Sequence, residues 1–118
     1  MSTRIVGNKG EDLACKYLQG QGYKILKRNF TIRGGEIDVI ARQKETLVFV
    51  EVKTRFGNEF GFAREAITSW KLKFLQKAAL FYITQTKWGE KPYRFDLVAI
   101  DYDQSNTPQI ELVKNITF

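Results

Sequence analysis

The sequence predicts an α/β fold, in which a mixed central β-sheet is flanked by helices and the elements follow the order αβββαββ. Two segments carry apolar residues at helical spacing, which is the pattern of amphipathic helices. Five shorter segments have the composition and the bounding turns that are typical of strands. A helix, three strands, a second helix and two further strands are expected to form one sheet with helices packed on it.

Each predicted helix has one apolar face. The first spans about 4–19 and ends at Gly20, and the second spans about 68–85 with Thr68 or Ser69 as its N-cap. The apolar face of the first helix consists of Leu13, Ala14, Tyr17 and Leu18. The apolar face of the second consists of Leu72, Leu75, Ala79 and Tyr82.

The predicted strands are separated by turn residues. They span about 23–30, 36–42, 47–53, 93–101 and 109–116. The segment 54–62 is expected to be a loop, because it carries two glycines. Its aromatic residues, Phe56, Phe60 and Phe62, could stack on bases, although anchoring of the loop or a dimer contact is the simpler interpretation. Trp70 and Trp88, on either side of the second helix, are expected to pack rather than to bind.

Length and composition limit the classes of function. The 118 residues suit one domain, residues 1–118, and the formal net charge of +6, from 19 basic and 13 acidic residues, favours a polyanionic partner. Nucleic acid is the first such partner and an anionic membrane surface the second. A single cysteine, Cys15, and the lack of an apolar run or signal peptide predict a cytoplasmic protein. Since the chain has no histidine, Ser-His-Asp and Cys-His triads and the usual zinc sites are excluded.

Charged residues lie together at one end of a predicted hairpin. Side chains alternate between faces along a strand, so Ile37, Val39 and Ala41 are expected on one face. The opposite face of the hairpin is apolar near the turn and charged at the far end. The residues expected on that face are Glu36, Asp38, Ile40, Leu47, Phe49, Glu51 and Lys53.

The register of this hairpin can be estimated from its turn. If residues 43–46 form the loop, Ile40 pairs with Phe49 and Asp38 lies opposite Glu51. Two carboxylates in that arrangement repel each other, and a divalent cation between them would remove the repulsion. Oxygen ligands suit a hard ion such as Mg²⁺ or Mn²⁺.

Other charged residues could complete such a site. Lys53 would project beside the ion, and Glu11 would contribute a carboxylate if the first helix packs near the open end of the hairpin. A plain surface ion pair between Glu36 and Lys53 is the competing interpretation.

Several segments together resemble a known family. Gly10-Glu11, 35–38 (Gly-Glu-Ile-Asp), 49–53 (Phe-Val-Glu-Val-Lys) and 94–96 (Arg-Phe-Asp) resemble the bacterial YraN-type proteins. These are related to archaeal Holliday-junction resolvases, within the restriction-endonuclease-like PD-(D/E)XK superfamily. The resemblance extends from about residue 7 to residue 100. One departure is Ile37, which stands where the name-giving motif of the superfamily has proline.

The resemblance implies a metal-dependent DNA endonuclease with a restriction-endonuclease-like fold. Asp38 and Glu51 would be metal ligands together with the backbone carbonyl of Val52, Lys53 would be the catalytic lysine, and Glu11 would match an acidic residue of the resolvase-like members. One or two ions of Mg²⁺ or Mn²⁺ would serve hydrolysis of phosphodiester bonds, with branched DNA as one substrate class. By analogy with the resolvases, a homodimer is expected.

Basic residues around this site are candidates for binding phosphates. They are Arg33, Arg55, Arg64 and Lys71. Two other functions remain open at this point. One is a nucleic-acid-binding module that keeps the fold without efficient cleavage, and the other is a basic domain that binds another protein or a membrane.

Overall fold

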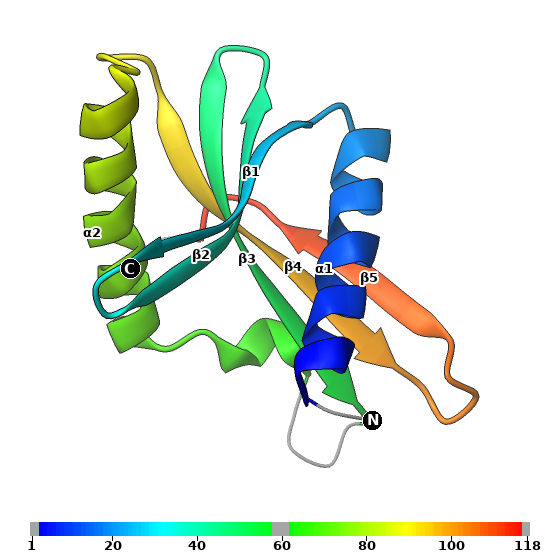
Figure 1. The fold of residues 1–118 in the computed structure, drawn as a ribbon. Helices are drawn as coiled ribbons and strands as arrows, with labels where there is room; N and C mark the ends of the chain where they lie inside the picture. Colours follow the sequence, from blue (N-terminus) through cyan, green and yellow to red (C-terminus); the bar gives the residue numbers. More distant parts are fainter. Residues whose placement is uncertain (1–2, 58–61, 117–118) are drawn as a thin grey trace.

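A computed structural model of the chain, which describes residues 3–57 and 62–116, shows the predicted αβββαββ order (Figure 1). A short 3-10 helix, η1, precedes the second long helix. The elements are α1 (Thr3–Gly20), β1 (Lys24–Ile32), β2 (Gly35–Gln43), β3 (Thr46–Phe56), η1 (Ala63–Ala66), α2 (Ser69–Thr86), β4 (Tyr93–Tyr102) and β5 (Pro108–Val113).

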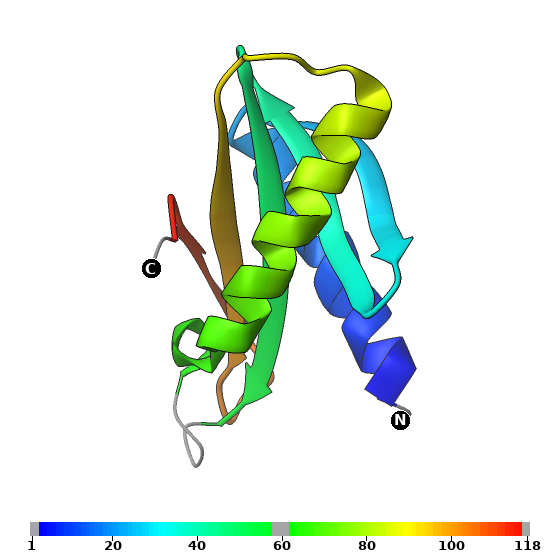
Figure 2. The same ribbon diagram turned by 90° about the vertical axis from the view of Figure 1, so that its left-hand side faces the viewer.

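The five strands form one mixed sheet in the order β1-β2-β3-β4-β5. Strands β3 and β4 are parallel, and the other neighbouring pairs are antiparallel. Since parallel neighbours need a crossover connection, α2 lies between β3 and β4 in the chain. The two long helices cover opposite faces of the sheet (Figures 1 and 2). This is the mixed sheet flanked by helices of the restriction-endonuclease-like fold.

Two apolar layers hold the helices to the sheet. Cys15 of α1 is buried between this helix and the sheet, where it packs as a small apolar residue. The α1 layer consists of Ala14, Cys15, Leu18, Tyr23, Val39, Ala41, Val48, Val50, Val98 and Ile100. The α2 layer consists of Phe30, Ile37, Ile40, Leu47, Phe49, Phe74, Leu75, Ala78, Ala79 and Phe95.

The predicted register of the β2–β3 hairpin is confirmed near its turn. Ile40 pairs with Phe49, and the pairs extend from Gln43–Thr46 to Val39–Val50. The loop is shorter than predicted, because Gln43 and Thr46 already pair and Lys44 takes a left-handed conformation with φ 54°. Beyond Val39–Val50 the two strands are no longer paired, so the predicted pairing of Asp38 with Glu51 is wrong.

The face predicted for Ile37 is wrong. Ile37 packs in the α2 layer with Ile40, whereas Val39 and Ala41 lie in the α1 layer. The alternation changes at Asn29, which has φ 54° and lies between the pairs Arg28–Val39 and Phe30–Ile37. The regular two-residue period thus fails at the same place in both strands, at Asn29 and at Asp38 opposite it.

Two other boundaries differ from the prediction by three residues. Strand β3 continues to Phe56, which pairs with Tyr102, where the sequence predicts a loop from residue 54. Strand β5 ends at Val113, three residues early, because Asn115 has φ 58° and the segment 114–116 turns back to β4. Phe60 and Gly61 of the predicted aromatic loop lie outside the described residues.

Thr68 is the N-cap of α2, and its hydroxyl accepts a hydrogen bond from the Lys71 amide at 3.1 Å. No helix in the described part of the chain is long and apolar enough to cross a membrane.

Candidate metal centre

The candidate site lies where β2 and β3 separate, beside the N-terminal half of α1. Gly10 permits the close packing of α1 on β3 at this point. A Cβ atom at Gly10 would lie 2.5 Å from the Thr54 Oγ1 atom, well inside van der Waals contact. The absence of a side chain at Gly10 therefore brings the next residue, Glu11, close to the diverging strands.

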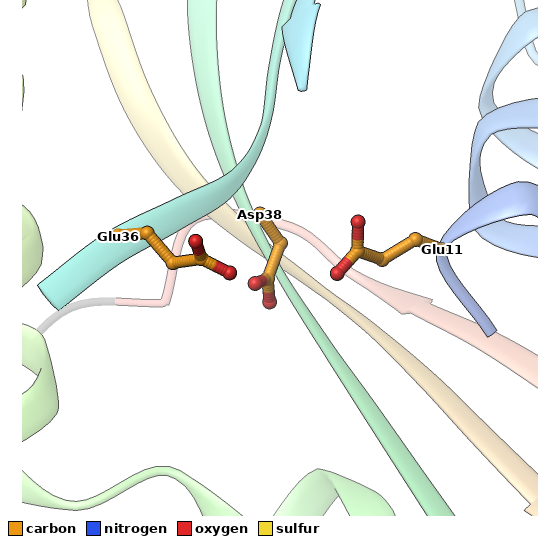
Figure 3. Close-up of side chains that lie close together, drawn as sticks. All are labelled: Glu11, Glu36 and Asp38. Atoms are coloured by element: carbon orange, nitrogen blue, oxygen red, sulfur yellow. The ribbon is translucent and has the colours of Figure 1, made fainter. Parts of the chain in front are cut away.

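Three carboxylates meet at this place. Glu11 of α1 and Glu36 and Asp38 of β2 each offer an oxygen atom, and these three atoms lie within 4.8 Å of one another. Figure 3 shows the three side chains converging, with Asp38 between the two glutamates. All three are partly buried, and oxygen donors at this spacing can hold a divalent cation.

Asn29 accounts for the direction of these side chains. Regular alternation would put Asp38 on the same face as Ile40, towards α2. Next to the left-handed Asn29, however, Phe30 and its partner Ile37 both pack towards α2. Arg28 contacts α1, with its Nη1 atom 2.7 Å from the Asp12 Oδ1 atom. Asp38, between Ile37 and Val39, is directed towards Glu11 of α1.

Glu51 is a buried carboxylate between two lysines. It is only 2% exposed, and its Oε1 and Oε2 atoms lie 3.6 Å from Lys53 Nζ and 3.5 Å from Lys71 Nζ. Burial raises the pKa of Glu51 to about 7, with a further contribution from the negative charge of Asp38 and a partial offset by the two lysines. Asp38 and Glu51 therefore interact electrostatically, although they are not a paired position of the sheet.

The surroundings of Asp38 and Glu11 also disfavour the charged forms of these two side chains. Burial raises the pKa of Asp38, and the Val52 amide, which donates a hydrogen bond to the Asp38 Oδ2 atom at 2.8 Å, opposes that rise. Burial, followed by repulsion from Asp38, raises the pKa of Glu11. A divalent cation bound among these carboxylates would reduce their mutual repulsion and lower their pKa values.

Two of these carboxylates have an oxygen atom that accepts no hydrogen bond. Among the described residues, the buried side-chain atoms without a hydrogen-bond partner are Glu11 Oε1, Glu51 Oε2 and Trp88 Nε1. Two of the three thus belong to this site. Each of these two carboxylate oxygens lies in a long ion pair, Glu11 Oε1 at 3.6 Å from Arg28 Nη2 and Glu51 Oε2 at 3.5 Å from Lys71 Nζ. A hard cation with oxygen ligands would supply the close partner that buried acceptors normally have. The residues present therefore fit Mg²⁺ or Mn²⁺.

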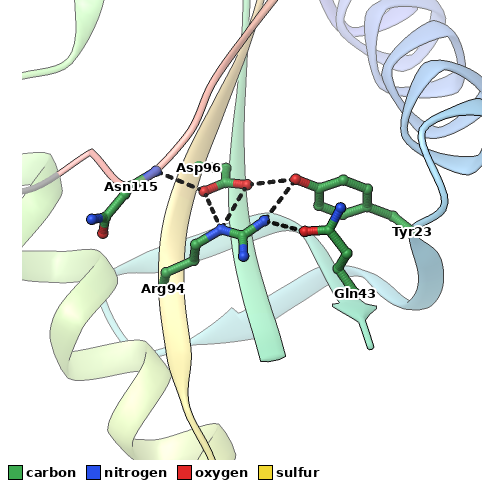
Figure 4. Close-up of polar contacts among 5 residues, drawn as sticks. All are labelled: Tyr23, Gln43, Arg94, Asp96 and Asn115. Atoms are coloured by element: carbon green, nitrogen blue, oxygen red, sulfur yellow. Dashed lines mark hydrogen bonds and ion pairs between the residues drawn. The ribbon is translucent and has the colours of Figure 1, made fainter. Parts of the chain in front are cut away.

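A second buried polar cluster, centred on Asp96, differs in this respect (Figure 4). Asp96 is fully buried, and its two oxygens accept hydrogen bonds from Tyr23, Arg94 and the Asn115 amide. Arg94 donates in turn to Tyr23 and to Gln43. Because this network is satisfied internally, it joins β4 to β2 and to the C-terminal segment and leaves no ligand position open.

The predicted phosphate-binding residues are dispersed. Lys71 reaches the site, where its Nζ atom also lies 3.4 Å from the Glu36 carbonyl oxygen. Arg33 is exposed in the β1–β2 turn, and Arg55 is exposed near the end of β3. Arg64 lies apart, with its Nη1 atom 3.7 Å from Glu111 Oε2, and it lines a pocket of about 630 Å³ that contains none of the site carboxylates.

Glu36 is the site residue that the sequence reasoning missed. Its expected partner was Lys53, but the ion pair that Lys53 makes is with Glu51. The position of Glu36 two residues before Asp38 was the available signal, since such residues share a strand face. For Lys71 the sequence predicts only a phosphate contact, because its approach to Glu51 depends on how α2 packs.

The matching protein family agrees with the motifs on which the site is built. Residues 10–100 match the family described as "Uncharacterised protein family UPF0102". The chain belongs to the UPF0102 family. This family includes the YraN-type proteins that the sequence resembles, so that prediction is confirmed. The UPF0102 match begins at Gly10, next to Glu11, and includes Asp38, Glu51 and Lys53.

UPF0102 relatives are similar over nearly their whole length. A UPF0102 protein of Geobacter metallireducens is 44% identical over 115 residues, covering 98% of this chain and 93% of the relative. One from Caldicellulosiruptor saccharolyticus is 42% identical over 116 residues and 98% of both chains. The solved structure of Pyrococcus furiosus SfsA in complex with Ca²⁺ aligns with a TM-score of 0.41 and 15% identity, covering 96% of this chain and 64% of that one. At that level, neither fold nor ligand can be transferred.

Proposed function

We propose that this UPF0102 protein is a divalent-metal-dependent endonuclease that hydrolyses phosphodiester bonds in DNA. One observation carries the proposal. Carboxylates from α1 and β2 converge next to the buried Glu51, which is flanked by two lysines, and carboxylate oxygens there lack hydrogen bonds. Branched DNA is the substrate class that the relation to Holliday-junction resolvases favours, and that relation also suggests a homodimer.

Asp38 and Glu51 would hold one or two ions of Mg²⁺ or Mn²⁺, with the Val52 carbonyl and Glu11 completing the ligands. Glu36 is a further candidate, since its oxygen atom belongs to the same group of three. A bound ion would polarise the scissile phosphate and lower the pKa of a water molecule.

The lysines have separate tasks in this scheme. Lys53 is 36% exposed, so its ammonium group can reach a bound phosphate while it remains near Glu51. It would offset the negative charge that develops on the phosphate oxygens in the transition state. Lys71 is more enclosed, with 21% of its side chain exposed, and would orient Glu51. The net charge of +6 would attract the DNA backbone, and binding would weaken as salt is added.

A cleavage assay on four-way junction, flap and linear duplex DNA tests this function. We expect cleavage with Mg²⁺ or Mn²⁺ and none with EDTA. Asp38→Ala should abolish cleavage and leave DNA binding largely intact. Glu45→Gln is the matched control, because Glu45 is an exposed carboxylate at the opposite end of the same hairpin, paired with Arg42. Binding without metal-dependent cleavage of any of these substrates would favour a binding module. No binding even at low salt would favour a protein-interaction domain.

A further inference from the structure

Trp70 is an exposed aromatic residue beside the candidate metal centre. Its side chain, in the first turn of α2, is 66% exposed, whereas the sequence analysis expects it to pack. The indole stacks on the Phe74 ring, with the ring centroids 6.1 Å apart and the planes 13° from parallel. One stacking contact therefore orients the indole while most of its surface remains free.

Phe74 connects this indole to the site. It is 8% exposed, and the Lys71 Nζ atom lies 5.2 Å from the centroid of its ring and 3.5 Å from Glu51 Oε2. The β1–β2 turn packs against the same ring. At Gly35, which has φ 154°, a Cβ atom would lie 3.1 Å from the Phe74 Cζ atom. The Trp70 indole and the Lys71 ammonium group thus both lie beside the buried Phe74 ring. They are close enough for one bound strand to contact both.

The charges around the indole suit a nucleic acid strand. Arg33 and Lys73 are both exposed, in the adjoining turn and on α2 respectively, and the chain as a whole is basic. Phosphates are attracted to such residues, while an exposed aromatic face attracts the flat face of a base. In a regular duplex that face is covered by the neighbouring bases. Away from duplex ends, an indole in this position can therefore stack only on a base that has left the duplex stack.

We propose that Trp70 is a stacking platform for an unpaired base next to the bond that is cleaved, so that the site takes single-stranded or locally unpaired DNA. This inference rests on the proposed nuclease function and narrows its substrate class. The phosphate of the bound nucleotide lies towards Lys71 and Glu51, and its base lies on the Trp70 indole.

DNA affinity measured by fluorescence anisotropy tests the proposal, with short oligothymidylate and a linear duplex of the same length as probes. Base stacking contributes about 1–3 kcal/mol per base, so Trp70→Ala should weaken oligothymidylate binding by about 5- to 150-fold. Duplex binding should change less than twofold in the same variant. Trp70→Phe should retain most of the affinity for oligothymidylate, because it keeps an aromatic face.

Phe81→Ala is the matched control. Phe81 is also an exposed aromatic residue of α2, 53% exposed, but it lies near Phe30, with the ring centroids 6.3 Å apart, and not near the carboxylates. This variant should bind both probes as the wild type does. Trp88→Phe supplies a second measurement, since the chain has two tryptophans and Trp70 is then its sole indole. In the Trp88→Phe variant, oligothymidylate should quench the fluorescence of Trp70, and the duplex should not.

The outcomes separate this inference from the proposed function. If the wild type binds oligothymidylate and Trp70→Ala binds it equally well, the stacking platform is wrong and the nuclease proposal stands. If Trp70→Ala weakens duplex and oligothymidylate equally, the preference for an unpaired base is wrong. If the wild type binds neither probe at low salt, both proposals fail together.

Discussion

The side chain of Glu51 combines two properties that both disfavour its charged form in a metal-free protein. It is almost completely buried, and it lies near a second acidic residue, Asp38. Two lysines reduce the cost of its charge without removing it, as the raised pKa shows. A buried carboxylate of this kind destabilises the folded state. Such a loss of stability is typical of residues that serve the activity of a protein.

Glu51→Gln is expected to stabilise the metal-free protein above neutral pH. The pKa of Glu51 is raised from 4.5 to about 7, so the folded protein holds a proton that the unfolded chain has released between these values. The free energy of unfolding therefore falls as the pH rises from 4.5 to 7, by about 1–3 kcal/mol from this group. Thermal unfolding in EDTA across that range should show a smaller decline for the variant, which should also be inactive. An identical decline in both proteins would contradict the assignment.

Lys53→Met is expected to reduce cleavage by about 100-fold or more, because it removes a cation from the developing phosphate charge. Affinity for DNA should change little. The comparison is Lys77→Met, which removes an exposed lysine of α2. Single-turnover cleavage rates measure both effects, and equal rates for Lys53→Met and wild type would exclude a role for this lysine in the reaction.

The sequence identifies the types of residue in the site better than their partners. Asp38, Glu51 and Lys53 follow from one hairpin register, and the pairs near its turn are as predicted. Glu36 could not be placed, because its neighbours depend on the left-handed residue opposite Asp38. The available signal was the residue type of Asn29, since asparagine is depleted in strands and is among the non-glycine residues that most often take a left-handed conformation.

Helix α1 and strand β3 pack so closely at Gly10 that no side chain larger than a hydrogen atom fits there. Gly10 faces Thr54 there, and the contact sets the distance between Glu11 and β2. The sequence alone could state only a condition, namely that Glu11 joins the site if α1 packs near the open end of the hairpin. The structure meets this condition because the smallest residue lies one position before the glutamate.

Gly10→Ala is expected to destabilise the protein, since the added methyl group would lie 2.5 Å from Thr54 Oγ1. Overpacking costs about 1–3 kcal/mol, against a gain of about 1 kcal/mol in helix propensity. The sharper prediction concerns the double variant with Thr54→Ala, in which the obstructing oxygen is gone. Denaturant unfolding of the four proteins should show that Gly10→Ala is at least about 1 kcal/mol less harmful in the Thr54→Ala background. Additive effects would mean that the contact is not tight.

The two buried polar clusters of the molecule have different tasks. The Asp96 network is closed on itself, whereas the carboxylates of the candidate metal centre have unsatisfied oxygens. The residues 94–96 contribute to the family resemblance as much as the site does, but their contacts are those of a structural connection. Sequence motifs of equal prominence therefore differ in role, and only the contacts distinguish them.

Asp96→Ala is expected to destabilise the whole fold by about 3 kcal/mol, because it leaves the Arg94 guanidinium without its carboxylate. Glu45→Ala, which removes an exposed carboxylate from Arg42, should cost about 0–1 kcal/mol. Urea unfolding compares the two variants with the wild type. A loss for Asp96→Ala no larger than that for Glu45→Ala would show that the network contributes little to folding.

The overall arrangement is the part that the sequence predicts best. Helical and strand periods, turn residues and one hairpin register suffice for the αβββαββ order. The length of β3 and the early end of β5 escape prediction, because both depend on contacts with β4. The same applies to Lys71 and Trp70, which reach the site region only because α2 packs across β2 and β3.

The claim on which the account depends is that this group of carboxylates binds a divalent cation. Crystals soaked in Mn²⁺ test it directly, since the anomalous scattering of manganese locates the ion without any assumption about activity. The account predicts a peak bounded by Asp38, Glu11 and Glu51, and its loss in Asp38→Asn crystals. Strong anomalous density elsewhere on the protein, with none between these carboxylates at saturating Mn²⁺, would contradict it.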